Sequence, residues 1–198
     1  MTPPPSSAPV TPEAFRGRYP HELERTWQPA GAPAVTIRAL RHEDLALERR
    51  FIEALSPETL YLRVQYFATT ASERDLERLL DLDYYDRLAV GAITQDATGE
   101  TLVGVSRYAR IEGTRRAECA IVVADGWQGR GLGTELMRTL AIAAQARAID
   151  CLEGTTLAEN ARIAAWARRF GFSVHTEPNS GGLLVVRMDL PGPTQSSG

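Results

Sequence analysis

The sequence predicts an α/β or α+β sandwich built on a mixed sheet. Segments with the two-residue period of strands and segments with the period of helices follow one another along the chain. An apolar strand at residues 117–123 also runs directly into a glycine-rich loop and a long amphipathic helix. The chain has 198 residues, of which 43% are hydrophobic and 24% charged, and this composition fits one globular domain with or without a tail.

The first elements are expected to be a strand and three helices. Residues 35–40 alternate apolar residues with Thr and Arg, as a half-buried strand does. Residues 44–55 place large apolar side chains on one helical face. A Ser-Pro pair starts the next helix, over 56–66, because Ser caps a helix and Pro suits its first turn. A third helix is expected over 72–80, where a capping pattern precedes three leucines.

From residue 88 onward the pattern changes to strands and then alternates. A hairpin with a turn at 96–99 comes first, and Gly171 is expected just beyond the end of the last helix. The predicted strands cover 88–94, 101–110, 117–123, 151–157, 173–175 and 183–190, and the predicted helices run from 132 to about 148 and from 160 to 170.

The two ends of the chain differ in composition from its middle. Residues 1–12 contain five prolines and two serines, and such a segment is expected to be disordered. The same holds for 191–198. Residues 13–34 form a lead-in with several apolar and aromatic anchors, and the folded domain is expected over 35–190.

Charge and cysteine content argue against several functions. The formal net charge is −3, from 22 basic and 25 acidic residues, without the basic excess of a nucleic-acid binder or of a protein bound to an anionic membrane. Cys119 and Cys151 lie in apolar runs and form no CxxC pair, so neither a disulfide framework nor a metal site is expected. No stretch has the length of a membrane span and Met1–Val10 lacks the features of a signal peptide, so a cytoplasmic protein is expected.

Residues 128–134, Gln-Gly-Arg-Gly-Leu-Gly-Thr, connect an apolar strand to the long helix. Glycines let the backbone turn its N–H groups toward one point at the helix N-terminus, where they form an anion site, and Arg130 adds a positive charge. A diphosphate is the expected ligand of this anion site. The loop lacks the Lys of a P-loop and does not fit the GxGxxG spacing of a Rossmann fold. A glycine-rich turn without a ligand is the remaining alternative.

The spacing Gln128-x-x-Gly131-x-Gly133 resembles the QxxGxG/A motif of the GNAT superfamily of acetyltransferases. The likeness covers about residues 35–190, and a second segment at 160–172, with Gly-Phe at its end, is similar as well. The segments that look closest to the catalytic domain of bacterial Pat-type protein lysine acetyltransferases are 19–24, 36–38, 55–63 and 117–123.

The resemblance implies a GNAT fold, with a mixed, mostly antiparallel central sheet flanked by helices. It implies acetyl-CoA as co-substrate and no metal. The diphosphate would lie on the loop amides, and the pantetheine arm would pair like an extra strand with the strand before the loop. A backbone N–H of that strand would polarise the thioester carbonyl. The cofactor-binding residues implied are Ile121, Val122, Val123, Gln128, Gly129, Arg130, Gly131, Leu132, Gly133, Thr134 and Asn160.

Glu118 is the expected general base. An amine attacks a thioester only after losing a proton, and freeing a lysine amine at pH 7 costs about 4.6 kcal/mol. Glu118 matches the glutamate of the AExA segment of Pat-type enzymes, and its place in an apolar strand predicts burial, which favours proton uptake. The alternative is a solvent-facing Glu118 paired with Arg115 or Arg116.

The sequence contains no evident general acid that would protonate the leaving CoA thiolate. Many GNAT enzymes place a Tyr four residues before the Gly-Phe pair, and Ala167 occupies that position here. Because a thiol of this kind has a pKa of about 8.5, the thiolate can leave unaided or take a proton from water. Tyr84 and Tyr85 are an alternative source of the proton.

The function implied by the resemblance is transfer of an acetyl group from acetyl-CoA to a primary amine, with a protein lysine as the preferred acceptor. Two alternatives stay open: an enzyme that acts on a small amine, and an acyl-CoA-binding sensor without turnover. A broad acidic groove would favour a protein lysine, whereas a closed pocket would favour a small amine. No nucleic acid or membrane is expected as a partner, and the chain would be a monomer or a homodimer.

Overall fold

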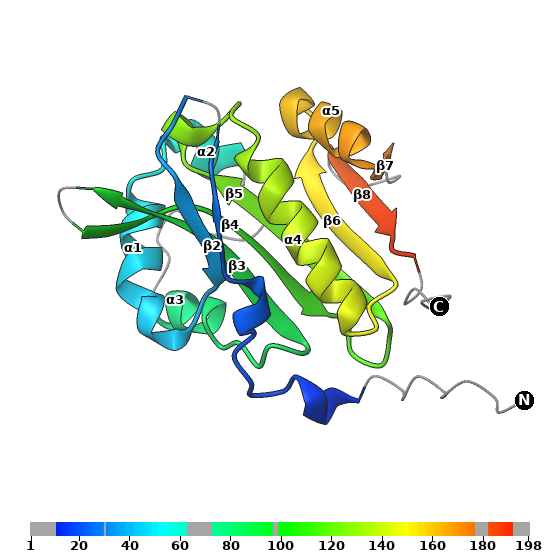
Figure 1. The fold of residues 1–198 in the computed structure, drawn as a ribbon. Coiled ribbons are helices and arrows are strands. Elements are labelled where there is room, and N and C mark those ends of the chain that lie inside the picture. The colour runs from blue at the N-terminus through cyan, green and yellow to red at the C-terminus, as the bar shows by residue number, and fades with distance from the viewer. Residues whose placement is uncertain (1–10, 30, 63–72, 97–98, 177–181, 192–198) are drawn as a thin grey trace, which may run out of the picture.

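The computed structural model describes residues 11–29, 31–62, 73–96, 99–176 and 182–191. Its strands form one eight-stranded sheet in this described part of the chain, with helices against both faces (Figure 1). The strands are β1 (Arg25–Trp27), β2 (Val35–Ala39), β3 (Arg87–Asp96), β4 (Gly99–Arg110), β5 (Arg116–Val123), β6 (Cys151–Leu157), β7 (Ser173–Thr176) and β8 (Leu183–Asp189). The helices are α1 (Leu45–Glu53), α2 (Pro57–Leu62), α3 (Glu73–Leu79), α4 (Leu132–Ala146) and α5 (Ala161–Phe170).

The sheet is mixed and mostly antiparallel, as the family resemblance implied. Its order is β1-β2-β3-β4-β5-β6-β8-β7. Among the strands of the described residues, only β5 and β6 run parallel, and α4 makes the crossover between them. The other neighbouring strands pair antiparallel. The single parallel pair therefore lies in the middle of the sheet, directly beside the glycine-rich loop.

Two apolar clusters hold helices on the two faces of the sheet. One joins α4 and α5 to side chains such as Ile37 and Val90, and the other joins α1 to side chains such as Ala89 and Val105. Because residues 89 and 90 point to opposite faces of β3, the clusters lie on opposite sides of the sheet. At Gly104 in β4, a Cβ would lie 2.9 Å from a Leu136 methyl group, so glycine allows α4 to pack close to the strand.

Local capping signals that the sequence carries are present in the structure. The Ser56 hydroxyl accepts a hydrogen bond from the Thr59 N–H at 3.2 Å, and Gly171 ends α5 with a φ of +117°. Several expected features lie outside the described residues: the tails at 1–10 and 192–198, the helical segment beyond residue 62, Ser72 and the turn at 97–98. Residue Pro12, expected to be disordered, begins a short 3-10 helix over Pro12–Ala14.

Strand β1 was not predicted, because the sequence indicates for residues 13–34 only a lead-in with apolar and aromatic anchors. β1 pairs antiparallel with β2, with Trp27 opposite Val35. The Arg25 guanidinium forms an ion pair with Glu135 and donates to the Thr139 hydroxyl at 2.7 Å, both on α4. The lead-in thus extends the sheet edge and is tied to the helix that follows the glycine-rich loop.

Candidate active site

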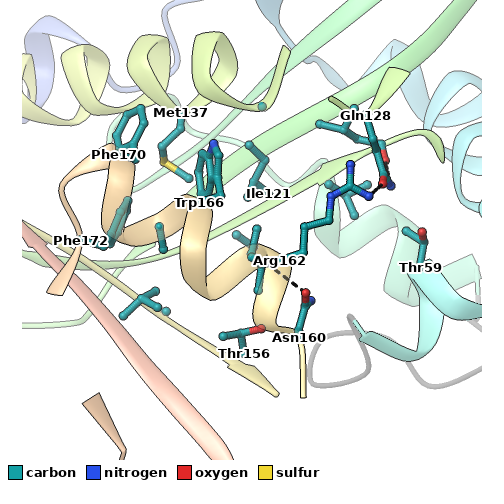
Figure 2. A pocket seen from close by; sticks show the side chains of 18 of the residues that line it. Thr59, Ile121, Gln128, Met137, Thr156, Asn160, Arg162, Trp166, Phe170 and Phe172 are labelled. Atoms are coloured by element: carbon teal, nitrogen blue, oxygen red, sulfur yellow. Dashed lines mark hydrogen bonds between the residues drawn. The ribbon is translucent and has the colours of Figure 1, made fainter. Parts of the chain in front are cut away.

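β5 and β6 are paired only over their first three residues, and their register ends at Glu118 and Glu153. Gly154 lies where the strands part, and a Cβ there would be 2.7 Å from the carbonyl oxygen of Cys119. Only glycine permits this last close approach of the two backbones. The gap that opens beyond it is part of a cavity of about 1130 Å³, which is large enough for a cofactor (Figure 2).

Replacing Gly154 with alanine is expected to lower the free energy of unfolding by about 2 kcal/mol, because a methyl group in this contact forces the two strands apart. Chemical denaturation measures the change. Gly126→Ala is the matched control, since a Cβ at Gly126 meets no atom within 4 Å. Equal stability of the two variants would contradict the close approach.

The free edge of β5 faces the gap. The Ala124 N–H donates to the Val103 carbonyl of β4 at 2.9 Å, so the even-numbered residues of β5 direct their polar backbone groups toward β4. The N–H and C=O groups of Ile121 and Val123 therefore point into the gap, whereas those of Val122 point to β4. All three residues line the cavity, and the Val122 side chain is buried on the α1 face.

The loop before α4 turns its backbone toward the same cavity. A 3-10 turn over Asp125–Trp127 leads into it, and Gly129 and Gly131 have φ values of +76° and +86°, in the left-handed region that favours glycine. Gly131 at the N-cap of α4 has no side chain that could cap the helix, so within the described part of the chain the N–H groups of the first turn are available for an anion. The Leu132 side chain is buried and anchors this turn. The loop residues that line the cavity are Gln128, Gly129, Gly131, Gly133 and Thr134.

Two arginines lie near the loop. The Arg130 guanidinium donates to the backbone carbonyls of Gly126 and Gly31 and is not among the side chains that line the cavity, so its role toward an anion stays a prediction. Arg162, in the first turn of α5, donates instead to the Gln128 side-chain oxygen at 2.7 Å (Figure 2). Gln128 in turn donates to the Val123 carbonyl at 3.0 Å, which ties α5 to the end of β5.

The first half of α5 forms the other wall of the cavity. Asn160 precedes this helix, and its Oδ1 accepts from the Ile163 N–H at 3.1 Å (Figure 2). The carbonyl of the side chain is thus used as a cap, and its NH2 group is the part suited to bind a ligand. The Trp166 indole donates to the Thr134 hydroxyl at 3.1 Å, so α5 is also tied to the first turn of α4.

Glu118 lines the cavity but is exposed, so its expected burial is wrong. Ala117 is buried with the α4 cluster, and the alternation of β5 places Glu118 on the opposite face of the sheet. The solvent-facing position of the alternative is found, but its pairing is not, because Arg115 and Arg116 form ion pairs with carboxylates of β6 and of the turn before it. The carboxylate stands at the edge of the gap, where the two strands separate.

Cys119, the next residue of β5, lines the cavity on the side of α4 and α5. Burial raises the pKa of its thiol to about 12, so the thiol is protonated at neutral pH. The thiolate is the nucleophilic form of cysteine. The arrangement therefore favours direct transfer between two bound substrates over an acetyl-cysteine intermediate.

Among the described residues, no tyrosine of those considered as an acid lies on the cofactor side of the cavity. Ala167, where many GNAT enzymes have a Tyr, is buried. Tyr84 and Tyr85 are not among the cavity-lining residues, and they pack against Tyr19 and Phe15. Tyr61 of α2 lines the cavity, on the face that carries Glu118.

The sequence predicts an acceptor groove at the helices around residues 51–67, but it does not predict which of their side chains line the cavity. α2 supplies Glu58, Thr59 and Tyr61, and α5 supplies Trp166 and Arg162, for which a solvated helix face is the favoured prediction. The helical periods predicted both helices, but the faces that line a cavity depend on which strands part, and this is a tertiary feature. The described residues contain no group of three or more potential metal ligands. None of the helices in the described ranges is long and apolar enough to cross a membrane.

Comparison with known proteins assigns the family. The acetyltransferase (GNAT) family matches residues 53–172. An acetyltransferase of Pseudomonas aeruginosa is 33% identical over 156 residues, which cover 79% of this chain and 84% of that protein. The acetyltransferase Pat of Mycolicibacterium smegmatis is 29% identical over 136 residues, which cover 69% of this chain and 40% of that protein.

Structural comparison agrees with the sequence relatives on the fold. The GNAT domain of S. lividans Pat superposes with a TM-score of 0.78 at 24% identity, over 87% of this chain and 100% of that domain. The splayed parallel pair, the glycine-rich loop and the extent of the sequence match all point to one family. The chain therefore belongs to the GNAT family of acetyl-CoA-dependent acetyltransferases.

Proposed function

We propose that the acceptor is a lysine side chain of a protein. The observation that supports a protein lysine is the acidic mouth of the cavity on the α2 side. Glu58, Glu118 and Glu159 line the cavity and are exposed, and Tyr61 beside them is 55% exposed. An open, negatively charged mouth attracts a cationic lysine on a large partner, whereas an acceptor site for a small amine is usually more enclosed.

The cofactor occupies the opposite side of the same cavity. Backbone N–H groups of the loop and of the first turn of α4 bind the diphosphate, and the free edge of β5 pairs with the pantetheine arm. Arg162 adds positive charge at this end. The residues assigned to cofactor binding through backbone or side chain are Ile121, Val122, Val123, Gln128, Gly129, Arg130, Gly131, Leu132, Gly133, Thr134 and Asn160.

Glu118 accepts the proton of the incoming amine. The amine nitrogen then attacks the thioester carbonyl carbon, and a backbone N–H at the free edge of β5 stabilises the charge that develops on the carbonyl oxygen. The C–S bond breaks, the acetyl group stays on nitrogen, and the nitrogen releases its second proton to solvent. The CoA thiolate takes a proton from water. The exposure of Glu118 allows it to pass its proton to solvent before the next turnover.

The charge of the acceptor is expected to control the rate. With acetyl-CoA saturating, a blocked peptide whose single lysine is flanked by arginines should show a kcat/KM about tenfold higher than one flanked by glutamates, because the mouth is acidic. The ratio should shrink as salt is added. Steady-state measurement of thiol release at two ionic strengths gives both values.

Two results would count against a protein acceptor. The first is efficient acetylation of n-butylamine, which carries the lysine amine without a peptide, together with no acetylation of either peptide. The second is an equal rate for the two peptides at low salt. Acetyl-CoA binding in calorimetry without any acceptor turnover would instead favour a sensor.

A further inference from the structure

The glycine-rich loop is in contact with the lead-in as well as with the cavity. A Cβ at Gly131 would lie 3.8 Å from the ring of Trp27 in β1, so this ring lies close to the backbone of the loop. Trp27 is half-buried and packs against the α4 cluster, but it is not among the residues that line the cavity. Gly131 therefore borders both the cavity and an aromatic ring of the lead-in.

Arg130 ties the loop to the lead-in by a hydrogen bond. Its guanidinium donates to the Gly31 carbonyl at 2.8 Å and to the Gly126 carbonyl, in the turn that leads into the loop, at 3.1 Å. Gly31 follows β1 with a φ of +67°, and the Gln28 side-chain amide donates to the Ala32 carbonyl across this turn at 2.6 Å. The Arg130 side chain thus joins the loop to a turn of the lead-in that is closed by its own hydrogen bond.

A third contact reaches the start of α4. The Arg25 guanidinium pairs with the Glu135 carboxylate and donates to the Thr139 hydroxyl. The Glu135 N–H in turn donates to the Gly131 carbonyl at 3.1 Å, which closes the first turn of the helix. The lead-in therefore contacts the same stretch of backbone that carries the N–H groups expected to bind the diphosphate.

A loop with three glycines gains from such contacts. Glycine leaves the backbone many conformations, so ordering these residues around a ligand costs free energy. Contacts that hold the loop before the ligand arrives reduce this cost, and the affinity for the ligand rises accordingly.

We propose that Trp27 and Arg130 are positioning residues, which together with Arg25 hold the loop and the start of α4 in the shape that binds the diphosphate of acetyl-CoA. This inference rests on the proposed function, since it assumes that the diphosphate lies on these amides. Arg130 acts through the shape of the loop rather than through its charge. The lead-in then sets cofactor affinity without taking part in acetyl transfer, because neither Trp27 nor Arg130 lines the cavity.

Variants of the two side chains test the proposal with the full chain. Trp27→Leu removes the ring but keeps an apolar side chain, and Arg130→Met keeps a long side chain that cannot donate to the two carbonyls. The Kd for acetyl-CoA by calorimetry is expected to rise about fivefold in each variant, the effect of one lost hydrogen bond or packing contact. With acetyl-CoA saturating, kcat should stay within about twofold of the wild type, measured with the arginine-flanked lysine peptide or, if the wild type prefers it, with n-butylamine.

Salt separates positioning from a direct contact between Arg130 and the diphosphate. A direct charge contact weakens as salt is added, so the difference between Arg130→Met and the wild type would then shrink. A loss caused by a loosened loop should persist, and the ratio of the two Kd values is expected to be the same at low and high salt. Arg50→Met is the matched control, because Arg50 is exposed, donates to the Glu100 carbonyl at 3.3 Å and does not line the cavity. It should leave the Kd unchanged.

Three results would overturn the inference. The first is a Kd within about twofold of the wild type in Arg130→Met or in a folded Trp27→Leu, the second is a loss in Arg130→Met that vanishes at high salt, and the third is an equal loss in Arg50→Met. Because Arg130 is exposed, Arg130→Met should fold even if Trp27→Leu does not, and its Kd then decides.

Gly131→Ala, which alters the loop directly, separates the inference from the function on which it rests. If Gly131→Ala weakens acetyl-CoA binding and the Trp27 and Arg130 variants do not, only the inference is wrong. If none of the three variants changes the Kd, the diphosphate does not lie on the loop, and the proposed cofactor site is wrong as well.

Discussion

Replacing Glu118 with glutamine is expected to lower kcat about 100-fold, the usual contribution of a general base, and to leave the Kd for acetyl-CoA nearly unchanged. Glutamine preserves the size of the side chain but cannot accept the amine proton. The structure places Glu118 at the edge of the gap and away from the loop amides, so cofactor affinity does not depend on it. Steady-state kinetics and calorimetry with acetyl-CoA measure the two quantities.

The pH dependence provides an independent check on this role. Without the carboxylate, the amine must lose its proton to solvent, so the rate of the Glu118→Gln variant should keep rising toward the lysine pKa of about 10.4. The wild-type rate should rise less steeply over the same pH range, because the carboxylate accepts the amine proton. Glu112→Gln serves as the matched control on an exposed site, and equal losses in kcat and in acetyl-CoA affinity would show that Glu118 is structural.

Replacing Gly131 with alanine is expected to weaken acetyl-CoA binding about tenfold or more, because loop N–H groups that turn away from the diphosphate lose charge-assisted hydrogen bonds. Gly131 precedes α4 with a φ of +86°, where a residue with a Cβ is strained by about 1 kcal/mol. The first turn of α4 must therefore shift or bear this strain. Calorimetry with acetyl-CoA measures the loss of affinity.

Two other glycines separate strain from binding. Gly113→Ala places the same strain, at a φ of +72°, in a turn away from the cavity, and it should lower stability without changing acetyl-CoA affinity. Gly126 lies in the segment before the loop, has ordinary backbone geometry and leaves open space for a Cβ. Gly126→Ala therefore adds neither backbone strain nor a close contact. If all three variants bind acetyl-CoA equally well, the diphosphate does not rest on these amides.

Features with a local physical cause could be predicted from the sequence. β6 was predicted with its observed bounds, and the glycine-rich loop, the capping Ser56 and the end of α5 at Gly171 follow from the preferences of single residues. β1 was missed, because three residues without alternation become a strand only through pairing with β2. Periodicity within a segment carries no information about such a partner.

The errors at the candidate site have a similar origin. Glu118 lies in an apolar strand, but the point at which β5 and β6 part leaves its side chain open to solvent. Arg130 has the right place in the loop sequence, yet carbonyls of the surrounding backbone hold its guanidinium outside the cavity. Arg162 adds positive charge from α5, which begins at Ala161, 30 residues after Gly131, the last residue before α4. Sequence spacing alone could not predict that Arg162 of α5 lies beside the glycine-rich loop.

The state of the cysteines also has a consequence for how the enzyme is assayed. Burial raises the pKa of Cys119 and of Cys151, so neither side chain reacts readily with an aromatic disulfide at neutral pH. Released coenzyme A, with its exposed thiol, reacts quickly under the same conditions. A colorimetric reading of new thiol can therefore be taken continuously on the native protein, with little background from the protein itself and little self-inactivation during the measurement.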